Sequence, residues 1–244
     1  MTTIVSALSR IARQCSVREP SSWVTATRDD QVELRDDFMA ETIDDILSRI
    51  DLPSPIGKQT TVTGGLAPAQ ADGSERFSLP SDFLRLQRDE LAVYDNLLDT
   101  RCVPITSDGS WKYLTDAGLA GAMKYYRTQG YDGNWTIDLY RMSGGDITIS
   151  YVSKNWMADS GGTAGDTLTA DTDVLLLPRR LVEAGTVWRF RERRGLPYEG
   201  KHVEYEALVA RLSNDYRGRR VVSFGGPGPK VKWTDLVPAS LIKS

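Results

Sequence analysis

The chain has 244 residues, of which 40% are apolar and 26% are charged, and its formal net charge is −3. This composition is ordinary for a folded protein, and the length suffices for one large domain or two small ones. The slight acidic balance gives no general attraction to nucleic acid or to an anionic membrane.

The sequence lacks the features of disulfide-rich, zinc-binding, secreted and membrane-spanning proteins. The two cysteines, Cys15 and Cys102, have no paired spacing that predicts a disulfide framework or a zinc site. The first residues lack the basic start and apolar run of a secretory signal, and no stretch approaches the roughly 18 apolar residues of a membrane span. We therefore expect synthesis in a reducing cytosol and no membrane contact.

Residues 2–52 have the periodicity of helices. A first amphipathic helix is indicated by Ile4, Leu8, Ile11 and Cys15, which fall on one helical face. A second helix is expected to begin near Asp29-Asp30, because carboxylates are stabilised at the positive end of a helix. It ends before Pro53, since proline cannot continue the hydrogen-bond ladder. Its apolar stripe consists of Val32, Met39, Ile43, Ile46 and Ile50.

The second helix also carries an acidic face, on the side away from the apolar stripe. One interpretation is a solvated surface. The other is the wall of a DNA conduit, whose like charges repel phosphate and let the strand slide. The face comprises Asp29, Asp30, Glu33, Asp36, Asp37, Glu41, Asp44 and Asp45.

Residues 57–170 alternate in polarity and are rich in turn formers, which predicts β structure. We expect a hairpin at Asp108-Gly109, with 101–105 and 111–114 as its strands. Segments 123–126, 135–140 and 147–152 are separated by glycine-containing turns and predict an antiparallel meander.

Residues 177–217 return to the helical period. Pro178 suits the start of a helix and Gly195 its stop, and a second helix follows Pro197. From Arg179 to Arg220 there are eleven Arg and Lys and six Asp and Glu, a local net charge of +5. Because the whole chain is acidic, we expect these arginines to pair with acidic faces of neighbouring subunits rather than with nucleic acid. The predicted contacts are Arg189, Arg191, Arg193, Arg194, Arg217, Arg219 and Arg220.

The C-terminal stretch is more apolar than a typical disordered tail. Such a segment usually docks on another surface. The apolar residues that predict docking are Trp233, Leu236, Val237, Leu241 and Ile242.

The sequence contains little that predicts catalysis. His202 is the single histidine, and no phosphate-binding loop occurs. Asp166, Asp171 and Asp173 lack the spacing of a calcium loop, so we interpret Asp173 as a capping or turn residue. We therefore predict neither an enzyme nor any cofactor or metal site.

Several short blocks, in this order and spacing, resemble the head–tail adaptor proteins of tailed bacteriophages, also called head completion or tail accessory proteins. The resemblance covers roughly residues 3 to 217 and is carried by 3–12, 77–86, 140–147, 151–154, 170–178, 185–190 and 195–198.

The residue patterns and the resemblance both imply an α+β fold, in which a helical bundle built from residues 1–56 and 171–218 holds an antiparallel β-rich insertion at 57–170. Residues 219–244 lie outside the resemblance, and their apolar composition predicts an extended docking tail. The resemblance implies a ring of about twelve copies at the head–tail junction of the virion, assembled in the host cytoplasm. The ring would dock on the portal protein, extend the channel for genomic DNA and receive the next tail or nozzle protein. No catalytic residue or cofactor comes with this family.

Two alternatives from other classes stay open. The β-rich zone could bind carbohydrate through its aromatic side chains, for which Trp111, Tyr125, Tyr126, Trp135 and Tyr140 are the candidates. A hydrolase that uses two carboxylates is the other alternative, because such a pair can come from any part of a chain.

Overall fold

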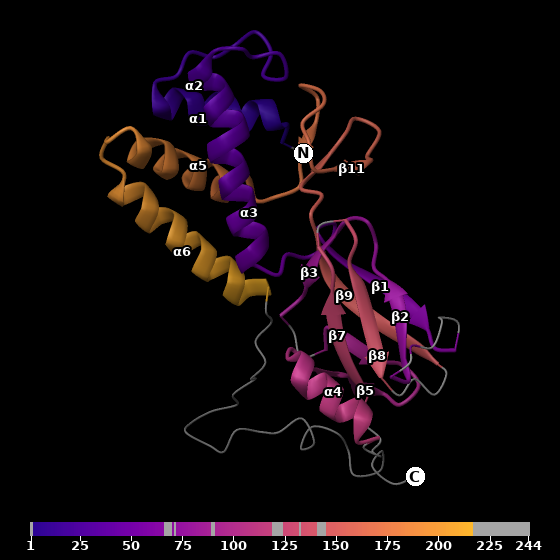
Figure 1. Ribbon diagram of the computed structural model, residues 1–244. Coiled ribbons are helices and arrows are strands. Elements are labelled where there is room, and N and C mark those ends of the chain that lie inside the picture. The colour runs from indigo at the N-terminus through magenta and orange to yellow at the C-terminus, as the bar shows by residue number, and fades with distance from the viewer. Residues whose placement is uncertain are drawn as a thin grey trace, which may run out of the picture.

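The computed structural model describes residues 2–65, 70, 72–88, 91–118, 124–131, 133–140 and 145–216. It is a mixed α+β protein in which most of the helices gather at one end and the large sheets at the other (Figure 1). Several predicted contact residues fall outside the described residues, namely Arg217, Arg219, Arg220, Trp233, Leu236, Val237, Leu241 and Ile242.

The first helix forms as the sequence predicts. Helix α1 (Ile4–Cys15) begins after Thr3, whose side chain accepts a hydrogen bond from the Ser6 amide. Its predicted stripe of Ile4, Leu8, Ile11 and Cys15 is buried. Directly before this helix, Thr3 forms an isolated antiparallel bridge with Val174 of the short strand β12 (Val174–Leu175).

The second helix begins at the predicted Asp29 but changes its winding. Helix α2 (Asp29–Val32) passes through a wider π-helical segment, η1 (Glu33–Phe38), into α3 (Met39–Arg49). The wider turn rotates the apolar face, because each residue in it advances less around the axis. Leu34 and Phe38 are therefore fully buried, whereas Val32, which we placed on the stripe, is only half-buried.

Helix α5 (Arg179–Arg193) contacts α1, α3 and α6 (Glu199–Tyr216), and all four contribute to one apolar core. The predicted stop at Gly195 is confirmed by its left-handed φ of 66°. Gly185 lies at a close contact between α5, α3 and α6, because a Cβ there would be 2.4 Å from Thr42 Cγ2 and 2.8 Å from Tyr205 Cε2.

The β part has two main sheets that pack face to face, since one core cluster draws side chains from both. Strand β9 (Asp146–Ser153) is the centre of the first sheet, with β1 (Gly57–Thr63) along one side and β3 (Phe83–Leu86) and β4 (Val93–Asp95) along the other. Strand β5 (Thr100–Arg101) pairs with β4 at the edge of that sheet. The second, in the order β2-β8-β7-β6, contains β2 (Ser74–Ser78), β8 (Thr136–Tyr140), β7 (Tyr125–Gln129) and β6 (Val103–Pro104).

Two predictions within the β part are wrong. Strands β7 and β8 form the expected antiparallel pair, but β8 does not continue to β9, which lies in the other sheet. The predicted hairpin at Asp108-Gly109 is instead the start of helix α4 (Asp108–Asp116). The Ser107 side chain accepts from the Ser110 amide, a cap that favours a helix over a turn, and Trp111 and Leu114 are then buried on one helical face.

Arg85 of β3 links the sheets to the helical part by hydrogen bonds and an ion pair. Its guanidinium donates to the Leu47 and Ile50 carbonyl oxygens at the end of α3, at 2.8 and 3.0 Å, and pairs with Asp51 at 2.6 Å. These bonds satisfy carbonyl groups that the end of a helix leaves without partners.

Candidate assembly surface

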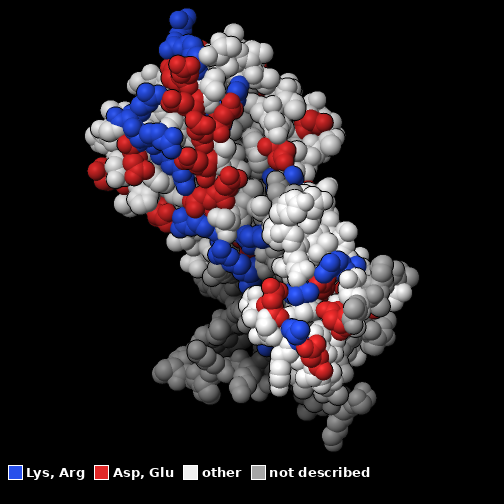
Figure 2. All heavy atoms as spheres, viewed as in Figure 1, with Lys and Arg blue, Asp and Glu red and all other residues white. Residues whose placement is uncertain are grey.

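The predicted acidic and basic faces lie beside each other on α3 and α5 and form ion pairs within one chain. Figure 2 shows the two charges as adjacent bands over the helical part. Arg194 Nη2 lies 2.6 Å from Glu33 Oε2, and Arg193 Nη2 lies 3.1 Å from Glu41 Oε1. Further along, Arg189 Nη2 lies 3.2 Å from Asp45 Oδ2. Residue numbers fall along α5 as they rise along η1 and α3, so the two helices run antiparallel.

The outer two pairs contribute little stability. Arg193 and Glu41 keep 59% and 48% of their side-chain surface exposed. Arg194 and Glu33 are exposed to a similar degree. Exposed pairs of this kind are worth about 0–1 kcal/mol, because water and salt screen them.

The inner pair belongs to a polar network that joins three helices. The Arg189 guanidinium is mostly buried and donates to Thr42 Oγ1 at 3.2 Å and to the Gly185 carbonyl oxygen at 3.3 Å. It also stacks on Trp188, with its Cζ 4.5 Å from the ring centroid. Tyr205 of α6 donates to Asp45 Oδ2 at 2.5 Å. Burial, followed by this bond to Asp45, raises the pKa of Tyr205, so its hydroxyl stays a donor.

Arg49 extends the network to the surface of α6. Its guanidinium binds Glu206 through two hydrogen bonds, of 2.8 and 2.6 Å, and lies 3.4 Å from Asp45. The bond to Arg49 lowers the pKa of Glu206 and so keeps that carboxylate charged. Arg191 acts on the other side of α5, where it donates to the Gln14 carbonyl oxygen at 3.0 Å and reaches α1.

The four described arginines of the predicted interface, 189, 191, 193 and 194, therefore all have partners in their own chain. Sequence reasoning identified both charged faces but assigned their pairing to different subunits. A contact of these residues with another subunit stays a prediction.

The acidic face keeps charges that the arginines do not neutralise. Asp30 pairs with Arg28, and Asp36 pairs with its neighbour Arg35. Asp29, Asp37 and Asp44 form no ion pair with any residue in the described ranges. Burial raises the pKa of Asp44 above its ordinary value. An acidic strip thus follows α2, η1 and α3.

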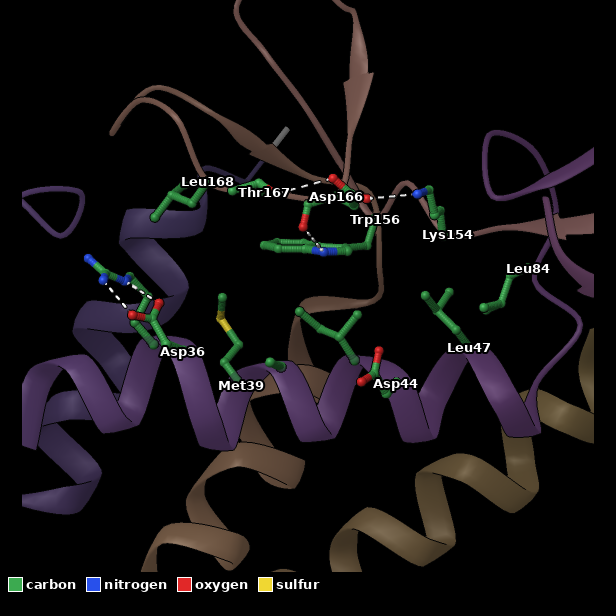
Figure 3. A pocket seen from close by; sticks show the side chains of 13 residues that line it. Asp36, Met39, Asp44, Leu47, Leu84, Lys154, Trp156, Asp166, Thr167 and Leu168 are labelled. Atoms are coloured by element: carbon green, nitrogen blue, oxygen red, sulfur yellow. Dashed lines mark hydrogen bonds and ion pairs between the residues drawn. The ribbon is translucent and has the colours of Figure 1, made fainter. Parts of the chain in front are cut away.

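A groove beside this strip was not predicted from the sequence. It lies between α3 and residues 154–168, has a volume of about 440 Å³, and is shown in Figure 3. Trp156 faces Met39 across it, and the Trp156 indole nitrogen donates to the Asp166 carbonyl oxygen at 2.9 Å. The lining residues are Arg35, Asp36, Met39, Ala40, Ile43, Asp44, Leu47, Leu84, Lys154, Trp156, Asp166, Thr167 and Leu168.

The only sequence signal for this groove is the apolar pair Trp156-Met157 within a stretch of turn formers. Met157 lies in the short strand β10 (Met157–Ala158), which pairs with β11 (Ala164–Gly165) and β12. This third sheet carries residues 154–168 across α3. Such a placement depends on long-range contacts that local patterns do not contain.

The aromatic residues of the carbohydrate alternative serve as core. Trp111, Tyr126 and Tyr140 are buried, and Tyr125 and Trp135 are half-buried against apolar clusters. Trp111 packs edge-on against Tyr140, with ring centroids 6.3 Å apart. These side chains do not form an open platform on which a sugar could stack.

His202 and the acidic residues Asp171 and Asp173 have structural contacts. His202 packs on Trp188, with ring centroids 4.8 Å apart. Asp173 accepts hydrogen bonds from the Thr169 and Ala170 amides, both at 2.8 Å, which is the predicted turn role. Asp171 accepts from the Trp23 amide at 3.1 Å. Among the described residues, no group of three or more His, Cys, Asp or Glu side chains is arranged to hold a metal ion.

Within the described ranges, no helix is both long and apolar enough to cross a bilayer. The sequence matches no protein-family model, and a search of curated proteins finds no match.

Proposed function

We propose that the protein is a structural adaptor of a phage head–tail connector, which forms a ring on the portal and extends the DNA channel. The proposal originates in the sequence resemblance. Within the structure, the observation that supports it is the acidic strip of Asp29, Asp37 and Asp44, which have no ion-pair partner among the described residues although an arginine-rich helix lies beside α3.

The strip suits a channel wall. Carboxylates repel the phosphate groups of DNA, so a duplex can pass without being held. The neighbouring arginines are bound to Glu33, Glu41 and Asp45, and this reduces their attraction for phosphate. We assign the acidic strip to the DNA channel and not to a subunit contact.

The arrangement of the chain is part of the proposal. Helices from both ends of the described sequence share one core around α5, and the β part lies between them in sequence. We interpret this as a helical bundle with a β-rich insertion and an extended C-terminal docking tail. In a ring, the bundle would be the contact layer between subunits.

The exposure of the arginines supports a choice among the residues proposed for the subunit contact. Arg189 and Arg191 donate hydrogen bonds to groups of their own chain. Arg193 and Arg194 keep much of their side-chain surface exposed. We propose Arg193 and Arg194, together with Arg217, Arg219 and Arg220, as the arginines that contact a neighbouring subunit or the portal. The tail residues from Trp233 to Ile242 would dock on the portal, and the opposite end of the ring would receive the next tail or nozzle protein.

Co-sedimentation with the portal protein from the same genome tests this assignment. The full-length chain should pellet with portal rings, and removal of residues 233–244 should weaken pelleting without changing the circular dichroism of the adaptor. Substitution of Arg193 and Arg194 by glutamate should also reduce it. Pelleting of the truncated chain at the full-length level would contradict the assigned role of the tail.

A further inference from the structure

We propose that the groove between α3 and residues 154–168 is a docking site for the C-terminal segment of the same chain, with Lys232 beside Asp44 and Trp233 beside Trp156. The inference does not depend on the proposed function, because it concerns the free protein, before the segment would leave the groove to dock on the portal.

The groove offers an apolar floor with a polar rim. Met39, Ile43 and Leu47 project from one face of α3, and Trp156 lies opposite them (Figure 3). Trp156 is held in place by its hydrogen bond to the Asp166 carbonyl oxygen, so its ring face is fixed toward α3. A volume of about 440 Å³ has room for one large side chain and its neighbours.

The charges at the rim of the groove favour a ligand that brings a cation to Asp44. Arg35 pairs with Asp36, at 2.5 Å, and Lys154 pairs with Asp166, at 3.3 Å. Asp44 is the remaining carboxylate, and within the described ranges no cation pairs with it. Asp44 lies at the exposed edge of the groove, and partial desolvation of its carboxyl raises the pKa of that group. A ligand with a cation next to a large apolar group would pair with Asp44 and cover the apolar floor of the groove.

The C-terminal segment has this chemistry. Lys230-Val-Lys232-Trp233 places two ammonium groups directly before an indole, and Leu236 and Val237 follow. Lysine can pair with Asp44 while tryptophan adds apolar contact, which is the larger contribution. The segment carries more lysine than acid. Asp44 of the groove has no ion-pair partner among the described residues.

The segment can also reach the groove. Helix α6 ends at Tyr216 and is bound to the end of α3 by the Arg49–Glu206 pair. The thirteen residues 217–229 span up to roughly 45 Å when extended, at about 3.3–3.6 Å for each residue. This exceeds the length of α3, an eleven-residue helix that rises about 1.5 Å for each residue.

Disulfide trapping in the full-length chain tests the proposal. Ala40 lines the groove, and Thr234 is next to Trp233, so Ala40→Cys and Thr234→Cys should form a bond within one chain on mild oxidation. The native Cys15 and Cys102 are buried and serve as an unreactive background. The matched control replaces Ala40→Cys by Leu91→Cys, an exposed site on the β part, and should trap far more slowly.

Two substitutions in the trapping background identify the contacts. Trp233→Ala should slow trapping at least about tenfold, because the apolar anchor is lost. Asp44→Asn should slow it roughly twofold to fivefold, the range of a partly exposed ion pair, and Asp29→Asn should not change it. Unchanged thermal melting of each variant shows that the fold is intact.

Three outcomes would overturn the proposal. Equal trapping by the Ala40 and Leu91 variants would mean random collision. Trapping that yields only disulfide-linked dimers would assign the groove to a second copy of the chain. Full trapping in the Trp233→Ala variant would show that the indole is not the anchor.

Discussion

The helical part and the sheet part of this molecule use charge in different ways. On the helices, the ion pairs of Arg193 and Arg194 lie at the surface, and their loss leaves groups that water can solvate. In the sheets, charges lie inside: Lys124 is 2% exposed and Asp95 is fully buried, with 2.5 Å between Nζ and Oδ2.

Asp138 of β8 is a second buried charge in the sheets. It is held between Arg76 of β2 at 2.7 Å and Arg127 of β7 at 3.0 Å, which ties together three adjacent strands. The exposed charges of Arg193 and Arg194 can therefore be changed with little cost to folding, which leaves them available for binding. The buried pairs of the sheets have to stay complete for the part to fold.

The largest expected effect comes from the buried pair. Burial raises the pKa of Asp95, but Lys124 and the Leu98 and Leu97 amides outweigh this, so its pKa lies below the ordinary value and the group stays charged. Lys124→Met leaves that charge without its cation and should lower the free energy of unfolding by about 3–5 kcal/mol.

Urea denaturation measures this loss. The double variant Asp95→Asn, Lys124→Met should recover most of it, since neither member of this pair is then charged. If Lys124→Met lowers the free energy of unfolding by less than about 1 kcal/mol, the charges of the sheets are no more important for folding than those on the helices.

The acid stability of the sheets follows from the same pair. Because the folded pKa of Asp95 is lower than its unfolded pKa, near 4, its contribution is complete above pH 4 and is lost as the pH falls further. In the Asp95→Asn, Lys124→Met variant, stability should fall less between pH 4 and pH 2 than in the native chain. An equal fall in stability between pH 4 and pH 2 for both proteins would contradict a contribution of Asp95 to acid stability.

The close helix contact at Gly185 gives the next effect. Gly185→Ala forces a methyl group against Thr42 and Tyr205 and should cost about 1–3 kcal/mol. The matched control is Gly200→Ala in α6, where nothing lies within 4 Å and alanine should be neutral or stabilising by up to about 1 kcal/mol. Thermal melts compare the two, and equal shifts would mean that α5 has more freedom than the contacts indicate.

Tyr205→Phe removes one hydrogen bond from the network of Asp45, Arg49 and Arg189. We expect a loss of about 1–2 kcal/mol, because the bond goes to a carboxylate that is partly reached by water. Tyr113→Phe, at an exposed site on α4, should leave the melting temperature unchanged. A larger loss at Tyr113 than at Tyr205 would exclude this interpretation.

The smallest effect is expected on the surface. A double-mutant cycle of Arg193→Ala and Glu41→Ala should give a coupling free energy below about 1 kcal/mol, and it should vanish at 1 M salt. Coupling above about 2 kcal/mol would show that this pair is structural and not available for a partner.

Local patterns predicted much of the helical part and less of the sheets. The α1 stripe, the start at Asp29 and the stop at Gly195 follow from periodicity and end signals, and the structure has them. The π-helical turn at 33–38 and the partner of β9 depend on packing between distant segments, which a periodicity does not encode. Helix α4 was missed because Asp108-Gly109 was interpreted as a turn, although Ser107 is a capping residue.

For the candidate site, sequence reasoning found both charged faces but not their geometry. Each face is visible as a cluster along one helix. That the two helices lie antiparallel and pair within one chain is a long-range fact, as is the passage of residues 154–168 over α3.

Electron microscopy of the full-length protein, alone and mixed with portal rings from the same genome, tests the proposed function most directly. We predict a ring of the same symmetry stacked on one end of the portal, with the Asp29, Asp37 and Asp44 strip facing the central channel. A protein that stays monomeric and leaves the portals bare would contradict the adaptor proposal.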